Sequence, residues 1–427
     1  MKILFTTKEK DAIKMDLFEK GLCEKNRFYI PPNSIYLSGH SLGLLSKDAE
    51  SSLARVVSEV KNLGVGGWMK AKTPWFSYAE KLSVLQAPLI GAKPEEVIVH
   101  GSTTINLYVL LSTFFNPKSK KKKILVEEPI FPSDKYAIES YLKLMGLDPK
   151  KNLKLVPSAN GEIIEEQEII KNMTDDVQLV ILPSVVYQTG QLLDIALLTR
   201  EAHKRGILIG FNCCHSVGIV AHQLSKDNVD FAFYCNYKYM NAGPGSVGGL
   251  YINQKHKNKR SGMAGWWGSK KEKQFDMLPD FDPAYLAGGF QISTPHIFSM
   301  APLEGVLGQY KKLGIKKIRE ASLKRTEYLM YLVDKLLKDK QVVICTPREK
   351  SRRGGSVTIK HPYAASLNKT LKEKGFISDY REPNLIRITP NPLYVSYHDI
   401  YKTAHAIKNI FETGEYKNYK NKRDAVA

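Results

Sequence analysis

The feature that most constrains the fold is an alternation of two apolar patterns between residues 95 and 252. Short runs rich in Val, Ile, Leu and Phe have the length of strands and are apolar on both faces, whereas several stretches between them repeat with the period of a helix. One such stretch, IALLTREAHKRG at 195–206, ends in the glycine expected just past a helix. The strand-like runs are EEVIVHG (95–101), KKILVEEP (122–129), VQLVILPSV (177–185), GILIGFN (206–212), VDFAFYCNY (229–237) and VGGLYI (247–252). The pattern predicts an α/β fold with a mainly parallel central sheet flanked by helices.

The sequence changes in character after about residue 310. One long amphipathic helix is expected over 314–338, followed by short strands at QVVIC, GSVTIK and LIRITP and by a last helix from SYHDIYKTAHAIKNIF. We therefore expect a large domain at 61–310 and a smaller α+β domain at 311–427, with an N-terminal segment at 1–60 that packs with the smaller domain.

The net charge of +20 on 427 residues raises the question of a polyanionic partner. The lysines, however, fall in separated clusters, KSKKKK, KHKNKR and YKNYKNKR, and no recognised nucleic-acid motif accompanies them. We expect a solvated surface and no specific nucleic acid. No apolar run approaches a membrane span of roughly 18 residues, and the start MKILFTTKEK lacks the core of a signal peptide. A cytoplasmic protein without membrane contact is expected.

The segment GFNCCHSVG at 210–218 places an amide, two thiols and an imidazole at the end of an apolar run. Five cysteines form an odd and sparse set for this length, which is typical of reduced thiols rather than a disulfide framework. Cys213 and Cys214 are adjacent and point to opposite faces of a strand, so they are poorly placed to share a metal or form a disulfide. We expect no metal site here and predict that the thiols are buried small side chains.

In open α/β sheets, ligands bind at the carboxyl ends of the strands, and polar residues follow several of the predicted strands here. Ser102, Thr103 and Thr104 lead into an apolar helix. They can cap that helix, or they can hold a phosphate at its amino terminus, where free N–H groups and the helix dipole favour an anion. The segments IFPSDKYA and QTGQLLD supply hydroxyls and a carboxylate at the same edge.

Lys238 lies between two tyrosines at the end of an aromatic strand, just before a glycine-rich turn at 243–245. A lysine in such apolar surroundings has a lowered pKa and can form a Schiff base with a carbonyl. A phosphate-binding helix start, an acid and a lysine of this kind are the groups that pyridoxal 5'-phosphate (PLP) requires.

The motifs around these residues resemble kynureninase, a family of PLP enzymes with the aspartate aminotransferase fold (PLP-dependent transferase fold type I). The resemblance extends from about residue 35 to 412. It rests on YLSGHSLGL, STTINLYVLL, FPSDKYAIES, VVYQTGQLLDI, NCCHSVG, VDFAFYCNYKYMNAGPG, GWWG and IRITPNPLYVSYHD. FPSDKYA, NYKYMNAGPG and RITPNPLY are peculiar to that family rather than shared by all PLP enzymes.

The resemblance implies roles for individual residues. Lys238 carries the cofactor, Tyr237 holds the phosphate and helps to move protons, and Asp134 contacts the pyridine edge. The implied cofactor site consists of Thr103, Thr104, Phe131, Asp134, Ser184, Asn212, His215, Tyr237, Lys238, Trp266 and Thr294. Trp266 and Thr294 match positions at which a neighbouring subunit completes the phosphate site, so a homodimer is implied. Arg387 and Ser41 are the implied substrate-binding residues, since a guanidinium suits a carboxylate.

The implied reaction is the hydrolytic cleavage of the Cβ–Cγ bond of L-kynurenine or 3-hydroxykynurenine. It gives alanine and anthranilate or 3-hydroxyanthranilate, and it belongs to the kynurenine pathway of tryptophan catabolism and NAD biosynthesis. Two positions depart from the family pattern. Asn212 replaces an aspartate that faces the pyridine nitrogen, and His40 stands where the family usually has Asn. Our hypothesis is that Asp134 alone keeps the nitrogen protonated, with Asn212 as its hydrogen-bond partner.

Two other interpretations remain open from the sequence. One is a different PLP reaction on the same scaffold, such as a class V aminotransferase or a cysteine desulfurase, for which Cys345 is the only candidate thiol outside the pocket strands. The other is a catalytically impaired homologue kept to bind an acidic partner. Which of the two kynurenines is preferred is also open, although Trp68 or Trp75 in GGWMKAKTPWF is expected to contribute to the aromatic end of the pocket.

Overall fold

A seven-stranded sheet forms the centre of the protein in a computed structural model that describes residues 5–19, 21–158 and 161–423. The strand order is β2-β8-β7-β6-β5-β3-β4, and every neighbouring pair is parallel except the two that involve β8. The strands are β2 (Val97–Val99), β3 (Lys123–Glu128), β4 (Leu153–Pro157), β5 (Val177–Pro183), β6 (Leu208–Asn212), β7 (Phe231–Tyr234) and β8 (Gly249–Ile252). The predicted α/β class with a mainly parallel sheet is confirmed.

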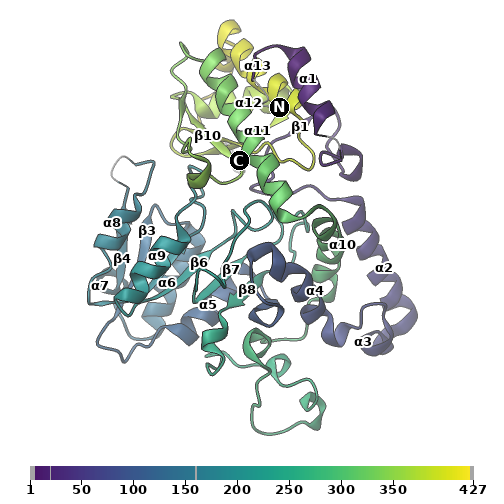
Figure 1. Cartoon of the computed structure of the whole chain (residues 1–427), viewed down its shortest axis with the longest axis vertical. Coiled ribbons are helices and arrows are strands. Elements are labelled where there is room, and N and C mark those ends of the chain that lie inside the picture. The colour runs from purple at the N-terminus through teal and green to yellow at the C-terminus, as the bar shows by residue number, and fades with distance from the viewer. Residues whose placement is uncertain (1–4, 20, 159–160, 424–427) are drawn as a thin grey trace.

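Helices surround this sheet (Figure 1). Helix α5 packs on β7 and β8, α9 on β6 and α4 on β2. The helices up to the end of this region are α2 (Lys47–Leu63), α3 (Gly67–Lys70), α4 (Tyr78–Gln86), α5 (Thr103–Phe114), α6 (Pro132–Leu144), α7 (Pro149–Asn152), α8 (Glu166–Lys171), α9 (Ile195–Lys204) and α10 (Ile297–Leu313). The core strands are apolar on both faces because helices cover them on both sides.

The C-terminal part is built on a four-stranded antiparallel sheet of order β12-β13-β10-β9. Its elements are α11 (Ile315–Leu336), β9 (Val343–Ile344), β10 (Val357–Lys360), α12 (Ala364–Glu373), β11 (Phe376–Ile377), β12 (Asp379–Arg381), β13 (Leu385–Ile388) and α13 (Tyr397–Thr413). The predicted long helix and the predicted last helix are both present. Figure 1 shows this part at one end of the molecule, where both chain termini also lie.

The N-terminal residues divide between two environments. Helix α1 (Glu9–Phe18) packs against α13, and the short strand β1 (Ile35–Tyr36) pairs with β11. Helix α2, in contrast, packs along α10. The division into segments at 1–60, 61–310 and 311–427 stays a proposal, and its second boundary falls within the last turns of α10.

Local sequence sets several helix ends. The Asp194 side chain accepts a hydrogen bond from the backbone N–H of Leu197 at the start of α9. Ser396 and Asp399 form a reciprocal capping box at the start of α13. Within the described residues, no helix is long and apolar enough to cross a membrane.

Candidate active site

Lys238 lies four residues beyond the end of β7, and its side chain is buried in a cavity at the carboxyl edge of the large sheet. Its Nζ donates a hydrogen bond of 3.0 Å to Nε2 of His215. Burial and the charge of Lys238 lower the pKa of His215 well below its usual value, so the imidazole is neutral and able to accept. Nζ also lies 5.9 Å from the ring centre of Phe131. The structure therefore places a buried amine between an imidazole and an aromatic ring.

The turn after Lys238 requires glycine. Gly243 and Gly245 have φ angles of +81° and +73°, a region that other residues rarely adopt. The backbone N–H of Gly43 donates to the carbonyl of Tyr237, which holds the 40–43 turn against the lysine segment. A side chain on Gly43 would clash with the Lys238 carbonyl. Two segments nearly 200 residues apart are thus fixed together by backbone contact.

Asp134 and Asn212 meet on the other side of the cavity. Asn212 Nδ2 donates to Asp134 Oδ2 at 2.5 Å, while its Oδ1 accepts from the backbone N–H of Cys214 at 2.9 Å. The second contact fixes the orientation of the amide, so that its donor faces the carboxylate. Burial raises the pKa of Asp134 to about 6, although Asn212 and Lys238 act in the opposite direction.

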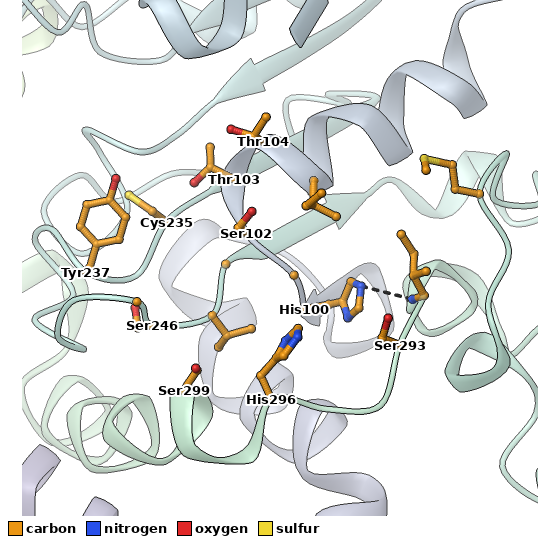
Figure 2. Close-up of a pocket in the computed structure, with 17 residues that line it drawn as sticks. His100, Ser102, Thr103, Thr104, Cys235, Tyr237, Ser246, Ser293, His296 and Ser299 are labelled. Atoms are coloured by element: carbon orange, nitrogen blue, oxygen red, sulfur yellow. Dashed lines mark hydrogen bonds between the residues drawn. The ribbon is translucent and has the colours of Figure 1, made fainter. Parts of the chain in front are cut away.

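The amino terminus of α5 opens onto the same edge. Ser102 is the N-cap residue, but its side chain makes no capping hydrogen bond, so the first N–H groups of the helix lack a side-chain partner. Thr103 Oγ1 contacts Cys214 Sγ at 3.7 Å, and Thr104 Oγ1 hydrogen-bonds with Ser133 Oγ at 2.9 Å. Figure 2 shows Ser102, Thr103 and Thr104 at the helix start, beside the cavity. These hydroxyls and N–H groups are placed where they can bind an anion.

Two adjoining cavities share Thr103, Thr104 and Tyr237 as lining residues. The smaller, of about 100 Å³, also contains Lys238, Asp134, Asn212, His215 and Phe131, and the larger, of about 740 Å³, extends from the α5 terminus past His100 and His296. A buried amine, an aromatic face, a carboxyl and an anion site at these positions match the aldehyde, ring, pyridine nitrogen and phosphate of PLP. The described residues therefore fit that cofactor.

Ser184 and Ser41 do not line either cavity. The Ser184 hydroxyl is fully buried behind β6, where it contacts Ser216 Oγ at 2.6 Å and the carbonyl of Asn212 at 3.2 Å. It supports the strand end that carries Asn212. Ser41 is half-buried in the turn that contacts Tyr237.

Arg387 lies in a buried ion pair that the sequence did not reveal. Its Nη2 is 2.5 Å from Asp379 Oδ2, and its Nη1 donates to the carbonyl of Tyr187 at 2.8 Å. Tyr187 lines the smaller cavity, so the guanidinium lies behind its wall. The Nε of Arg387 is buried with no hydrogen-bond partner among the described residues. His40 lies beside the pair, with Nδ1 2.5 Å from Thr389 Oγ1 and Nε2 3.4 Å from Asp379.

The remaining predicted residues lie away from the cavity within one chain. Trp266 is exposed, and its Nε1 donates to the carbonyl of Gln274. Thr294 is also exposed. Neither residue lines the two cavities. Trp68 and Trp75 pack edge to face with ring centres 5.8 Å apart, and neither lines these cavities.

Sequence reasoning missed several residues that line the smaller cavity, among them Glu127 and Tyr187. Glu127 is a buried acid at the end of β3 whose pKa is raised well above its usual value by burial, and Tyr187 packs edge to face on Phe131. A carboxylate inside the otherwise apolar run KKILVEEP was the available signal. Cys345, the candidate thiol for a desulfurase, is buried just after β9, and its N–H donates to Thr358.

The fold and the site define an enzyme of the PLP-dependent fold type I class. Solved structures of similar fold include the cystine C–S lyase C-DES, at TM-score 0.74 and 17% identity, covering 89% of this chain and 97% of that chain. A cysteine desulfurase from Thermococcus onnurineus NA1 matches at TM-score 0.71 and 18% identity, covering 89% and 95% of the two chains. These likenesses concern the fold alone.

Sequence comparison is more specific. Residues 318–407 match the kynureninase C-terminal domain family. Kynureninases from Geobacillus thermodenitrificans and Shouchella clausii are each 51% identical over 94% of this chain and 94% of their own length. The kynureninase of Bacillus cereus is 48% identical over 97% of both chains. The chain belongs to the kynureninase family.

Proposed function

We propose that the protein catalyses the hydrolytic cleavage of L-kynurenine or 3-hydroxykynurenine at the Cβ–Cγ bond. The products are alanine and anthranilate or 3-hydroxyanthranilate. The observation that carries the proposal is the buried amine of Lys238, 3.0 Å from a neutral His215 and in one cavity with Asp134, in a chain about half identical to kynureninases. PLP, once bound, supplies an electron sink that withdraws electrons from the substrate's α carbon.

Four features of the chain hold the cofactor in this proposal. Lys238 Nζ would hold the cofactor covalently through its aldehyde, and Phe131 would supply an aromatic face for its ring. The N–H groups at the start of α5, with the hydroxyls of Thr103 and Thr104, bind its phosphate. Asp134 is the acid at the pyridine nitrogen. Because Asn212 donates to Asp134, it orients the carboxylate but adds no negative charge.

Lys238 and Tyr237 are the proton-transfer groups in this proposal. With PLP bound, the Nζ of Lys238 would take the proton from the substrate's α carbon. Burial raises the pKa of Tyr237 far above its usual value, so its Oη stays protonated and able to donate. Neutral His215 accepts from Lys238 and keeps the amine directed into the cavity.

Arg387 is the proposed site for the substrate carboxylate. One Nη group is bound to Asp379 and the other to the Tyr187 carbonyl, whereas Nε has no hydrogen-bond partner within the part of the chain that the structure describes. Nε and the remaining Nη hydrogens are therefore the donors that a carboxylate would engage. The net charge of Arg387, Arg381 and Asp379 is +1, which suits a single carboxylate.

We further propose a homodimer in which Trp266 and Thr294 of one subunit complete the phosphate site of the other. Both residues are exposed and outside the cavity of their own chain. Large exposed apolar side chains also concentrate between residues 263 and 298, around Trp266 and Thr294. They are Met263, Trp266, Phe275, Met277, Leu278, Tyr285 and Phe298. Tryptophan breakdown in the cytoplasm is the setting we propose, and it rests on family membership.

The test adds L-kynurenine and 3-hydroxykynurenine separately to purified PLP-loaded protein and follows product fluorescence and alanine release. Lys238→Ala is the control. Cleavage of at least one substrate, lost in the control, is expected. If the protein binds PLP, as its absorbance reports, and cleaves neither substrate, the proposal is wrong.

A further inference from the structure

Cys214 and Cys235 lie beside each other just past the ends of the neighbouring strands β6 and β7, at the proposed cofactor site. Asn212 of β6 and Phe233 of β7 are partners in the parallel ladder, and each cysteine lies two residues further along its own chain. The backbone N–H of Cys235 donates to Cys214 Sγ at 3.2 Å, and Cys235 Sγ lies 4.0 Å from the Cys214 carbonyl. The strands that lead into the pair are about 4.8 Å apart, which lies within the Cα separation of about 4.4–6.8 Å that a disulfide spans.

The surroundings favour the thiolate at one of the two sulfurs. Burial alone would raise the pKa of Cys235, but the Cys214 thiol, Lys238 and Tyr237 together lower it to about 6. Burial raises the pKa of Cys214 well above its usual value, so that thiol keeps its proton. A thiolate next to a protonated thiol is the arrangement found in oxidisable pairs, because the thiolate is the reactive form.

The pair is open to small molecules through the cavities. Cys235 lines the larger cavity of about 740 Å³, and Cys214 lines the smaller one. Figure 2 shows Cys235 with Tyr237 and Thr103 around that cavity. Cys213, adjacent in sequence to Cys214, is fully buried and lines neither cavity. Only one thiol of the Cys213–Cys214 sequence therefore faces the site.

We propose that Cys214 and Cys235 are an oxidisable dithiol, and that the disulfide between them prevents the cofactor from binding. The oxidant is hydrogen peroxide or an organic hydroperoxide. The Cys235 thiolate attacks a peroxide oxygen, so the O–O bond breaks and a sulfenic acid forms. The Cys214 sulfur then attacks that sulfur, the S–S bond forms and water leaves. Overall, two thiols and one hydrogen peroxide give one disulfide and two water molecules.

The effect on the cofactor follows from what the two sulfurs contact. Cys214 Sγ lies 3.7 Å from Thr103 Oγ1, a proposed phosphate ligand, and a disulfide removes the thiol proton from that contact. Cys235 precedes Tyr237 and Lys238 by two and three residues, so a bond at Cys235 displaces the lysine segment. The effect of the disulfide on cofactor binding rests on the proposed PLP site, whereas the formation of the disulfide does not. Bound PLP covers the pair and is expected to slow its oxidation.

The experiment treats the purified full-length protein with hydrogen peroxide, with and without saturating PLP, and counts alkylated cysteines after denaturation. Without PLP, the count should fall from five to three, that is by the two sulfurs of one disulfide. A trypsin digest should then contain a reducible link between the peptides 206–226 and 227–238. The dissociation constant for PLP, measured by absorbance, should rise at least tenfold and return after reduction with dithiothreitol.

Variants assign the link to one cysteine pair. Cys214→Ala and Cys235→Ala should each lose the peptide link and the peroxide effect on PLP binding, whereas Cys213→Ala should retain both. The proposal that Cys214 and Cys235 form an oxidisable pair is wrong if the peptide link persists in Cys214→Ala. It is also wrong if the wild-type protein keeps all five thiols after peroxide treatment. An oxidised protein that binds PLP as tightly as the reduced one overturns its effect on the cofactor. A reduced protein that binds PLP but cleaves no kynurenine would count against the proposed function alone.

Discussion

In the proposed PLP site, Asn212 would determine how much negative charge faces the cofactor. Its Oδ1 accepts from the N–H of Cys214, so the amide can only donate toward Asp134, and Asp134 would be the one acid that faces the pyridine nitrogen. An anion next to a protonated ring nitrogen contributes several kcal/mol even at an effective dielectric near 20. The strength of the electron sink therefore depends on a single side chain.

Asn212→Asp tests this dependence. With PLP bound, a second carboxylate should stabilise the protonated ring nitrogen, and we expect kcat to rise about tenfold, equivalent to roughly 1.4 kcal/mol. Without PLP, the two acids 2.5 Å apart should repel each other and lower the melting temperature. Steady-state kinetics and thermal unfolding with and without PLP measure both effects. An unchanged or lower kcat would contradict our hypothesis, because it would show that having Asn212 in place of the family aspartate costs no turnover.

The raised pKa of Asp134 gives a pH dependence of stability with a defined sign. Burial raises this pKa from 3.8 to about 6, so between about pH 4 and pH 6 the folded chain keeps a proton that the unfolded chain has lost. Stability consequently falls as the pH rises through that window, by roughly 3 kcal/mol in total. Asp134→Asn lacks this titration. After removal of PLP, the variant should melt with the wild type near pH 4 and several degrees above it at pH 7.5.

Calorimetry across pH 4 to 8 measures that difference. A constant gap between the two proteins would mean that Asp134 does not titrate in the window. The loaded Asp134→Asn enzyme should also lose about a hundredfold in kcat, because no anion then remains at the ring nitrogen. A stabilising substitution that removes activity is typical of a catalytic group.

At the scale of elements, β12 and β13 bring a buried charge pair to the back of the cavity. Asp379 and Arg387 are direct partners in this antiparallel pair, and both side chains are about 2% exposed. Arg381 lies two residues after Asp379 on the same face, and its Nη2 is 3.2 Å from Asp379 Oδ2. Burying such a pair costs desolvation energy, and removing one of its two partners leaves the other as an unpaired buried charge. The site thus depends on the register of two short strands.

Arg387→Leu and the double variant with Asp379→Leu separate these contributions. The single variant should lose about 3–5 kcal/mol of unfolding free energy, because Asp379 stays buried without its main partner. The double variant should recover most of that stability, while both lose substrate binding. Urea unfolding and the KM for kynurenine give the two readouts. If the double variant is no more stable than the single one, the loss comes from packing rather than from the unpaired charge.

At the scale of the whole molecule, the proposed site requires two chains. Lys238 lies inside the cavity, whereas Trp266 and Thr294 are exposed and away from it in the same chain. In a symmetric dimer, each subunit would lend these residues to its partner. Two defective chains should then complement each other.

Mixing Lys238→Ala with Trp266→Ala tests this arrangement. In a mixed dimer, the cavity of the Trp266→Ala chain receives an intact tryptophan from the Lys238→Ala chain, so one of two sites is complete. After unfolding and refolding at equal amounts, half of the dimers are mixed, and activity should reach about one quarter of the wild type. Each variant refolded alone is the control. Activity that only averages the two controls would argue for sites within single chains.

The sequence alone was sufficient to predict most strands of the large sheet. Each of the six apolar runs forms a strand, because strands covered by helices on both faces must be apolar throughout. It did not reveal β4, whose residues are mostly half-exposed at the sheet edge, or the very short β11 and β12. Edge and short strands lack a continuous apolar run, so periodicity does not distinguish them from loops.

The candidate site also contains features that the sequence predicted and features that only the tertiary structure shows. The sequence pointed to Lys238, the acid of FPSD and the start of α5, because each follows a predicted strand and the carboxyl ends of such strands meet at one edge. The roles of Asp134 and Asn212 came from the family resemblance and stay predictions. Tertiary structure alone decided which groups touch. It paired Asn212 with Asp134 and Arg387 with Asp379, and it set Cys235 against Cys214. These contacts depend on strand register and on side-chain direction across neighbouring elements, which local sequence does not encode.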